Sequence, residues 1–366
     1  MMRGFLCFLM SALLFISPAA VARAAAPLES PHVDWGILAF PALEPYNLIE
    51  FYLKWADAAQ AALEETAQLG TTRVLIAKTW RELEPKNSQY NLKDLRHQAA
   101  AVRKLKQSIF FGLQLINTQK RELPEDLAEK SWADPTMRSR VLAFLDKALP
   151  LLTDGRPLYV SFGNEVDVYF ASRPEEVEAF CELFEAVRAH VRLNYPEVKL
   201  GITATDEGLR GDRSALITRL NRSTDVLMLT YYPTKDMKVM PPDSPQRDLP
   251  RMVAYAAGKP IVLQEVGYPR AVGVGSSPQA QADFIREFFS AWERHRQAIP
   301  HINLFLQTDV GTRICDQWTG YYGFTAHRQL FADFICTLGL KDAYGNPKPA
   351  WQLLQNEIAP KLRRAP

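Results

Sequence analysis

Short apolar runs alternate with amphipathic helical patterns along most of the chain. The runs are rich in β-branched residues and are bounded by turn residues, which is typical of buried parallel strands. We expect eight strands, at residues 33–40, 73–78, 109–116, 158–163, 198–203, 226–231, 261–264 and 302–306. Between them, apolar residues follow the spacing of one helical face, for example over 141–152, 177–191 and 284–292. The pattern predicts a strand–helix unit repeated eight times.

Eight such units without a change in composition favour a closed (β/α)8 TIM barrel of class α/β, built as a single domain over residues 27–366. A doubly wound open sheet is the alternative, but no G-x-G-x-x-G motif follows the first strand. Ser277 and Pro278 predict the start of a helix, with an N-cap followed by proline at the first helical position. In a barrel of this kind, catalytic groups lie just after the strands, at their carboxyl ends.

The first 26 residues form a pattern of their own. Arg3 precedes an apolar run over 4–16, and small residues follow up to Ala26, as in a secretory signal peptide. The run is short for a membrane span, which needs about 20 apolar residues. We expect cleavage after Ala26 and a soluble mature protein, secreted or periplasmic, with no membrane segment. An uncleaved anchor is the alternative.

Charge and composition exclude several classes of protein. The 366 residues include 43 Lys+Arg and 41 Asp+Glu, and removal of Arg3 and Arg23 with the leader leaves 43 − 2 = 41 basic residues against 41 acidic ones. No basic excess is available for a nucleic-acid backbone, so nucleic acid is not an expected partner. With 47% hydrophobic residues, the chain is too apolar to be disordered. The sequence carries no signal for an oligomeric state.

Cysteine and histidine spacing gives no metal site. The six histidines form neither H-x-H nor H-E-x-x-H, no C-x-x-C occurs, and no Gly-x-Ser-x-Gly elbow is present. We therefore expect no metal or organic cofactor. Outside the leader, Cys315 and Cys336 are the only pair that we consider for a disulfide, and Cys181 lies on an apolar helical stripe as a core residue.

Two expected strands end in a glutamate. Glu165 follows the fourth strand, and Glu265 lies at the end of the seventh. A carboxylate at a buried strand end carries a desolvation cost, so its presence there indicates function. Two carboxylates that face each other across a barrel mouth are what glycosidic cleavage requires.

The motifs around these residues extend over nearly the whole mature chain. They are Gly163-Asn164-Glu165, Gln264-Glu265-Val266-Gly267-Tyr268, Arg73 with Trp80 and Glu84-Pro85, Thr230-Tyr231-Tyr232-Pro233, and the tail at 338–351. With these motifs the sequence resembles the retaining glycoside hydrolases of the large (β/α)8 clan that includes cellulases, mannanases and galactanases.

The resemblance implies a role for each matched residue. Glu165 would be the general acid/base and Glu265 the nucleophile, and Asn164 would bind the sugar 2-hydroxyl. Tyr231 would donate a hydrogen bond to Glu265, with its neighbour Tyr232 as the competing choice. Arg73 would support the nucleophile electrostatically, with a charge merely paired inside the barrel as the alternative. Donors beside Glu265 would lower its pKa.

Aromatic residues are expected to bind the sugar. Trp80 is one candidate for lining the cleft. The clan commonly has a Trp at the end of strand eight, where we count Gln307 in this chain. The sugar platform would then come from the loop that follows, from Trp318, Tyr321 or Tyr322.

We therefore expect a secreted retaining β-glycosidase that takes a β-linked oligo- or polysaccharide as substrate. A non-catalytic carbohydrate-binding protein on the same scaffold is one alternative, favoured by the missing Trp. A lyase that uses Lys78 is another, although a lone lysine is more often a rim charge. Four further carboxylates follow strands and are interpreted as solvated rim charges: Asp167, Asp206, Glu207 and Asp309.

Overall fold

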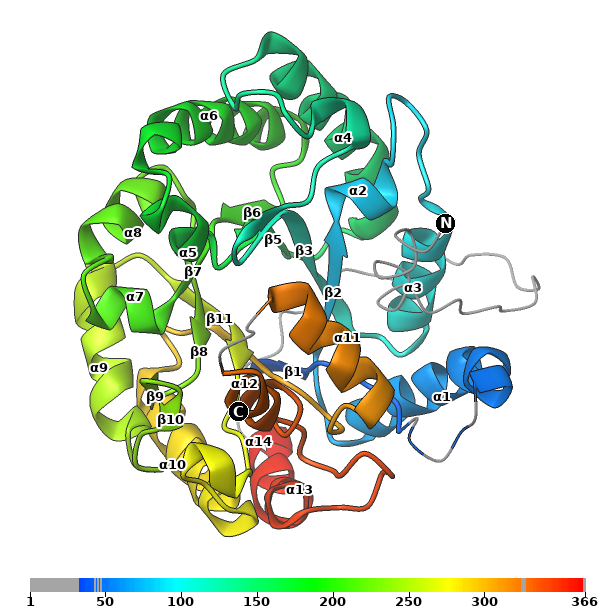
Figure 1. Ribbon diagram of the computed structural model, residues 1–366, viewed down its shortest axis with the longest axis vertical. Helices are drawn as coiled ribbons and strands as arrows, with labels where there is room; N and C mark the ends of the chain where they lie inside the picture. The colour runs from blue at the N-terminus through cyan, green and yellow to red at the C-terminus, as the bar shows by residue number, and fades with distance from the viewer. Residues whose placement is uncertain (1–32, 43, 45, 47, 324–326, 365–366) are drawn as a thin grey trace. The chain divides into compact units, whose positions relative to one another are not determined.

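The computed structural model describes residues 33–364, apart from residues 43, 45, 47 and 324–326 (Figure 1). The expected leader at 1–26 lies outside the described residues. No helix in the described part of the chain is long and apolar enough to cross a membrane.

All eight predicted strand segments are strands, and the fifth is split into β6 and β7. Their bounds are β1 Asp34–Ile37, β2 Arg73–Thr79, β3 Ser108–Asn117, β5 Leu158–Asn164, β6 Val198–Gly201, β7 Thr203–Thr205, β8 Leu227–Tyr231, β11 Ile261–Val266 and β12 His301–Leu304. Three two-residue strands complete the set: β4 Lys120–Arg121, β9 Thr234–Lys235 and β10 Lys238–Val239. The eighth segment differs from expectation, because β12 ends at Leu304 and not at residue 306.

Strand order follows the order of the chain, as a barrel requires. One sheet runs β2-β3-β5-β6 and the other runs β1-β12-β11-β8-β7, so the last long strand pairs with the first. The pairs of β1 with β12, β11 with β12, β3 with β5, and β5 with β6 are all parallel. This order, with a helix after most strands, is that of the predicted α/β TIM barrel.

The chain divides into two compact units. Unit 1 holds residues 32–74 and 230–366, and unit 2 holds residues 75–229. Both divisions fall inside strands, within β2 and within β8. The expectation of a single domain stays a prediction.

Helices fill the connections between strands. Their bounds are α1 Leu48–Gln68, α2 Trp80–Leu83, α3 Lys93–Lys104, α4 Pro135–Leu152, α5 Val166–Ala171, α6 Val177–Asn194, α7 Asp206–Arg210, α8 Ser214–Asn221, α9 Pro245–Ala256, α10 Pro278–His295, α11 Thr312–Tyr322, α12 Arg328–Ile335, α13 Pro349–Leu353 and α14 Ala359–Arg364. The predicted N-cap is confirmed, since the Ser277 hydroxyl accepts a hydrogen bond from the Ala280 amide at the start of α10.

The apolar helical faces pack as the sequence predicts. In unit 2, α4 lies against α3 and α6, and in unit 1, α10 lies against α9 and α13 (Figure 1). Phe288 of α10 stacks on Tyr231 of β8, and Phe284 packs on the same ring at a tilt. Cys181 is buried on α6, as expected for a core residue.

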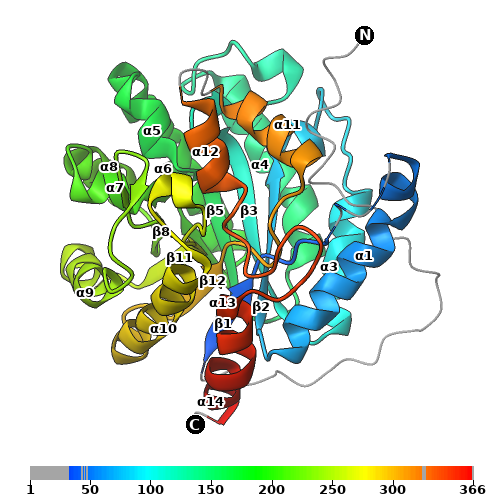
Figure 2. The ribbon, with the colours of Figure 1, turned by 60° about the horizontal axis from the view of Figure 1, so that its bottom comes forward.

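A disulfide ties together two helices of unit 1. Cys315 of α11 and Cys336, directly after α12, are bonded, with their Cα atoms 5.6 Å apart. The two helices lie side by side in Figure 2. The pair considered from the sequence is therefore the pair that the structure contains.

Candidate active site

Glu265 owes its orientation in unit 1 to an irregularity in β11. The register pairs Leu263 with Ile302 but Val266 with Leu304, so β11 has one residue more than β12 over this stretch. A bulge of this kind re-aims a side chain and is common beside active sites. Glu265 is half-buried, whereas the rest of β11 is buried. The bulge thus presents one carboxylate at the carboxyl end of the strand.

The hydroxyl group that serves Glu265 belongs to Tyr232. Its Oη donates to Glu265 Oε2 at 2.7 Å. Tyr231, the residue expected in this role, is wholly buried, and its Oη donates to Asp248 Oδ2 at 3.1 Å. The assignment of Tyr231 as the donor to Glu265 and as a substrate-binding residue is therefore wrong. Adjacent residues at a strand end point to opposite sides.

The electrostatics of Glu265 also differ from expectation. Burial raises the pKa of its carboxyl, and the hydrogen bonds from Tyr232 and Gln264 oppose that rise. The donors therefore act in the predicted direction, but desolvation outweighs them and the pKa is raised overall. A half-buried carboxylate that is costly to ionise is a strong base and nucleophile once it is ionised.

Arg73 lies too deep in unit 1 to support Glu265 directly. Its guanidinium forms an ion pair with Asp34, at 2.8 and 2.9 Å. Asp34 is paired in register with His301, and His301 with Val262, three residues before Glu265 on β11. Three residues of strand span about 10 Å. Arg73 therefore neutralises a buried acid below the strand ends, and the role predicted for it at the nucleophile is wrong.

The same cluster explains the state of Asp34. Burial acts to raise the pKa of this carboxyl, but Arg73 and His301 outweigh burial and hold the pKa well below its usual range. Burial lowers the pKa of His301, which favours its neutral form. The Arg73 charge is thus balanced inside unit 1 by Asp34.

An aromatic wall stands beside Glu265. We use this name for Tyr232, Phe305, Trp318, Phe40 and Phe334, which are all half-buried. The Tyr232 ring meets Phe305 and Phe334 edge-on, with ring centroids 6.2 and 5.4 Å apart. The centroid of the Trp318 ring lies 6.4 Å from that of Phe305 and 6.0 Å from that of Phe40. Half-buried rings offer a face on which a sugar can stack.

The wall revises the expected sugar platform. Because β12 ends at Leu304, the aromatic residue at its mouth is Phe305, which the sequence analysis missed. Gln307 is buried, with its amide bonded to Glu65. Trp318 belongs to the wall, whereas the Tyr322 ring packs on Tyr321 and Phe331; the sugar-binding role of both residues stays a prediction.

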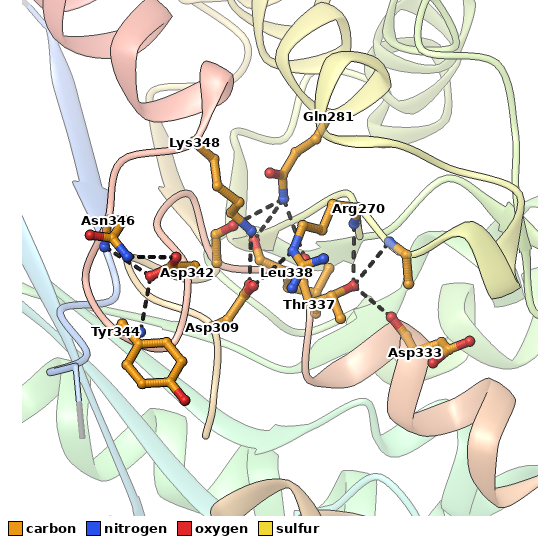
Figure 3. A network of polar contacts seen from close by, with 12 residues as sticks. Arg270, Gln281, Asp309, Asp333, Thr337, Leu338, Asp342, Tyr344, Asn346 and Lys348 are labelled. Atoms are coloured by element: carbon orange, nitrogen blue, oxygen red, sulfur yellow. Dashed lines mark hydrogen bonds and ion pairs between the residues drawn. The ribbon is translucent and has the colours of Figure 1, made fainter. Parts of the chain in front are cut away.

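A polar network in unit 1 anchors the segment that follows Glu265 (Figure 3). The Gln281 amide donates to the carbonyl oxygens of Tyr268 at 2.8 Å and Gly339 at 3.1 Å. Asp309 accepts from Arg270 at 3.0 Å and from Lys348 at 2.9 Å. Residues 268–270 are thereby fixed to the tail at 337–348, which gives the tail motif a structural role.

Burial sets the charges of this network. Burial raises the pKa of Asp309, and the positive charges of Lys348 and Arg270 oppose this rise. Burial also lowers the pKa of Lys348 to about 8, and the Asp309 carboxylate opposes this fall. The ion pair is almost completely covered, with side-chain exposures of 8% for Lys348 and 3% for Asp309. Each charge therefore depends on the other.

In unit 2, Glu165 is held at the end of β5. It adopts a left-handed backbone conformation (φ 50°, ψ 41°), and its Oε2 accepts a hydrogen bond from the Thr118 hydroxyl at 2.9 Å. Asn164, one residue earlier, is buried and donates from Nδ2 to Asn117 Oδ1 at 3.3 Å. Glu165 and Asn164 thus lie at a strand end, with Thr118 and Asn117 of the neighbouring strand end as their partners.

The motif residues Trp80 and Glu84 serve the packing of the fold. Trp80 is fully buried and donates from Nε1 to Glu84 Oε2 at 2.9 Å. Glu84 is also buried and pairs with Arg140 at 2.8 Å. Trp80 is therefore a core residue, and its assignment as a substrate contact is wrong.

Three of the four competing carboxylates are buried and not solvated as interpreted. Asp167 pairs with Arg213, Asp206 with Arg210, and Asp309 with Lys348. Only Glu207 is exposed. Buried carboxylates of this kind are held by ion pairs and serve the fold.

Lys78 is also buried, so its interpretation as a rim charge is wrong. It lies five residues after Arg73 on β2, and its side chain therefore points to the opposite face of the strand. Burial lowers its pKa, and Glu82 and Asp94 oppose the shift. This position disfavours a Schiff-base role. Within the described ranges, no group of three or more His, Cys, Asp or Glu residues could hold a metal ion.

Comparisons with known proteins relate the chain to solved structures by fold. No protein-family model and no curated protein matches the sequence. A GH5_18 variant from Streptomyces cattleya, in complex with Manb1-4GlcNAc, matches with a TM-score of 0.69 and 18% identity over 92% of this chain and 81% of that one. The exo-beta-1,4-mannosidase Op5Man5 from Opitutaceae bacterium strain TAV5 matches with 0.68 and 18%, over 91% of this chain and 60% of that one.

A GH53 catalytic domain from Ignisphaera aggregans matches with a TM-score of 0.57 and 16% identity, over 92% of this chain and 99% of that chain. At these identities the likeness is one of fold. The (β/α)8 barrel predicted from the sequence is confirmed.

Proposed function

We propose that the protein is a retaining β-glycosidase that hydrolyses the O-glycosidic bonds of a β-linked oligo- or polysaccharide. One observation carries the proposal. On a barrel of glycoside hydrolase type, Glu165 and Glu265 each stand at a strand end, and each carboxylate accepts a hydrogen bond from a hydroxyl, at 2.9 and 2.7 Å. In such barrels, the carboxyl ends of the strands form the active-site face.

The reaction proceeds by double displacement. Glu265 attacks the anomeric carbon while the glycosidic C–O bond breaks, and Glu165 gives its proton to the leaving oxygen. Water then attacks the glycosyl ester, Glu165 takes the proton from the water, and the Glu265 carboxylate leaves. Retention needs the two carboxyl groups to be about 5 Å apart.

The surroundings of Glu265 support its role as the nucleophile. Burial makes the free carboxylate costly, and formation of the neutral ester removes this cost, so desolvation favours the attack. The Tyr232 hydroxyl keeps enough of the carboxyl ionised and fixes its direction. Asn164, next to the acid/base, is the residue that we assign to the sugar 2-hydroxyl.

The aromatic wall supports a sugar ligand beside Glu265. Tyr232, Phe305 and Trp318 offer ring faces of the kind on which the C–H face of a pyranose packs. Among β-linked sugars, we place β-1,4-mannosides first, because a structurally similar protein is described as an exo-beta-1,4-mannosidase and another was crystallised with Manb1-4GlcNAc.

Export is part of the proposal. The sequence of residues 1–26 has the order of a secretory signal, and a secreted or periplasmic glycosidase would meet extracellular glycans. Expression of the full chain in a Gram-negative host, followed by fractionation and N-terminal sequencing, should give a mature protein that begins at Pro27. Uncleaved protein in the membrane fraction would contradict the leader assignment.

A panel of β-linked glycosides with activated leaving groups, with and without azide, tests the catalytic assignment. Glu165→Ala should lose most activity and, with azide, yield a glycosyl azide of retained configuration. Glu265→Ala should yield the inverted azide, because azide then attacks from the vacated nucleophile side. Glu207→Gln, an exposed glutamate that also follows a strand, serves as the matched control and should keep full activity.

Two results would overturn the proposal. Full activity of Glu265→Ala would remove the nucleophile assignment. Binding of glycans without hydrolysis of any panel member by the wild-type protein would favour a non-catalytic carbohydrate-binding protein. The anomer released first, followed by NMR, separates retention from inversion.

A further inference from the structure

Two neighbouring strand ends in unit 2 carry non-glycine residues in the left-handed conformation. Thr118 follows β3 with φ 53°, and Glu165 follows β5 with φ 50°. This conformation is uncommon for any side chain and is a genuine outlier for a β-branched residue such as threonine. Backbone strain of this kind persists where the surroundings enforce it, and it clusters at functional sites. The strain at Thr118 therefore calls for a reason.

The contacts of Thr118 supply one. The parallel register pairs Asn117 with Asn164, so Thr118 and Glu165 are the next residues on the two strands. The Thr118 amide donates to the Asn164 carbonyl at 2.9 Å, and its Oγ1 donates to Glu165 Oε2 at 2.9 Å. Thr118 is 9% exposed, so water competes little for this hydroxyl.

The hydroxyl has a second, weaker acceptor. Asn117 Oδ1 lies 3.5 Å from Thr118 Oγ1, which is long for a hydrogen bond between oxygens. The single hydroxyl hydrogen is therefore directed to Glu165. Both residues of the Asn164–Glu165 pair are thus held by one threonine, through its main chain and its side chain.

The chemistry of a carboxylic acid gives this contact a consequence. A protonated carboxyl has one oxygen that donates and one carbonyl oxygen that only accepts. A donor fixed on Oε2 makes Oε2 the accepting oxygen, so the proton resides on Oε1. After the proton has left, the same donor still holds the ionised group in place.

We propose that Thr118 is a positioning residue that directs the catalytic proton to Oε1 of Glu165 and holds this carboxyl in place through both steps of the reaction. The inference rests on the proposed function and deepens it by adding a residue to the acid/base machinery. A charged acceptor gains more from a donor than a neutral one, so Thr118 also makes Glu165 give up its proton at lower pH.

Three substitutions separate the hydroxyl from the backbone. Thr118→Val keeps the shape and removes the hydroxyl, and Thr118→Ser keeps the hydroxyl. Thr118→Gly removes the hydroxyl and also relieves the left-handed strain, so this variant should fold even if the valine variant does not. Thr218→Val is the matched control, because Thr218 is an exposed threonine on α8 whose hydroxyl donates to the Ser214 carbonyl.

We expect the valine and glycine variants to move the alkaline limb of the kcat/KM–pH profile up by about one pH unit. Their kcat near the optimum should fall by roughly tenfold, because the proton is no longer directed. The serine variant and Thr218→Val should keep the wild-type profile. If Thr118 has only a backbone role, the alkaline limb of the kcat/KM–pH profile of Thr118→Gly will stay at the wild-type pH. This result would overturn the proposal.

A readout that needs no turnover separates this inference from the proposed function. Carbon-13 NMR of protein labelled at the glutamate side-chain carboxyls, with Glu165→Gln for assignment, follows the titration of Glu165 directly. We expect a higher midpoint in Thr118→Gly than in the wild-type and Thr118→Ser proteins, and equal midpoints overturn the proposal. A shifted midpoint in a protein that cleaves no panel substrate would overturn the proposed function and leave the hold of Thr118 on Glu165 supported.

Discussion

Replacing Tyr232 by Phe is the sharpest test of the electrostatics at Glu265. The change removes one hydroxyl, 2.7 Å from Glu265 Oε2, and leaves the ring that packs on Phe305 and Phe334. A hydrogen bond to a charged group contributes about 1.5–3 kcal/mol. One pH unit corresponds to 1.36 kcal/mol, so the loss is worth roughly 1–2 pH units in the ionisation of the carboxyl.

The sign of the shift follows from the role of Glu265. The nucleophile must be ionised, and burial already raises its pKa against the pull of Tyr232 and Gln264. Without the Tyr232 hydroxyl, the carboxyl stays protonated to higher pH. The acidic limb of the kcat/KM–pH profile should therefore move to higher pH by roughly 1–2 pH units.

The measurement is a kcat/KM–pH profile on the best substrate of the panel, with thermal unfolding as a check on folding. Tyr231→Phe is the matched control, since that hydroxyl donates to Asp248 and should not affect the acidic limb. The reasoning is refuted if the acidic limb of folded Tyr232→Phe is unchanged or moves to lower pH. It is also refuted if Tyr231→Phe shifts the acidic limb by the same amount.

Three further predictions concern binding and stability. Phe305→Ala should lower kcat/KM by roughly tenfold and Phe305→Trp should restore it, whereas equal activity of all three would remove Phe305 from the sugar site. Lys348→Met should lower the free energy of unfolding in urea by about 3–5 kcal/mol, because the buried Asp309 carboxylate then keeps only the more exposed Arg270 as its cation; a smaller loss in the double variant with Asp309→Asn checks the cause. Changing Cys315 and Cys336 to Ser removes a disulfide between residues 21 positions apart and should lower the free energy of unfolding by about 3 kcal/mol. Reduction of the wild-type protein should have the same effect. No loss in either case would show that the disulfide does not stabilise the fold.

The barrel could be predicted because its strands are apolar on both faces. Runs such as 109–116 and 261–264 stand out from the helical patterns between them, and all eight became strands. The residue at which a strand ends is harder to predict, since periodicity does not fix where a strand stops. Because β12 ends at Leu304, two residues before the expected end, the residue that follows it is Phe305, whereas the sequence alone points to Gln307.

The two glutamates could be singled out from the sequence because an acid after an apolar strand is unusual, but their partners could not. Tyr231 and Tyr232 are equivalent in the motif, and only the register of β8 decides which one donates to Glu265. Thr118 carries no sequence signal, since its role depends on the pairing of β3 with β5.

The partners of buried charged side chains are the feature that the sequence predicts least well. The sequence shows that Asp309 and Arg73 are charged. It does not show that Lys348 and Arg270 pair with Asp309, or that Asp34 pairs with Arg73. The two cations that pair with Asp309, Arg270 and Lys348, each lie 39 positions away along the chain. For Asp309 and Lys78 the sequence alone favours solvent as the partner, whereas the fold surrounds each with other charged side chains.

The bond between Asp309 and Lys348 has a practical consequence for producing the protein. A gene shortened before codon 348, or loss of the tail after a protease cut in the 340–347 segment, would leave the buried Asp309 carboxylate with Arg270 and without Lys348. Such fragments should be insoluble or rapidly degraded, and they should not persist as a smaller working form. An affinity tag is therefore better appended after α14 than exchanged for any part of the final helices.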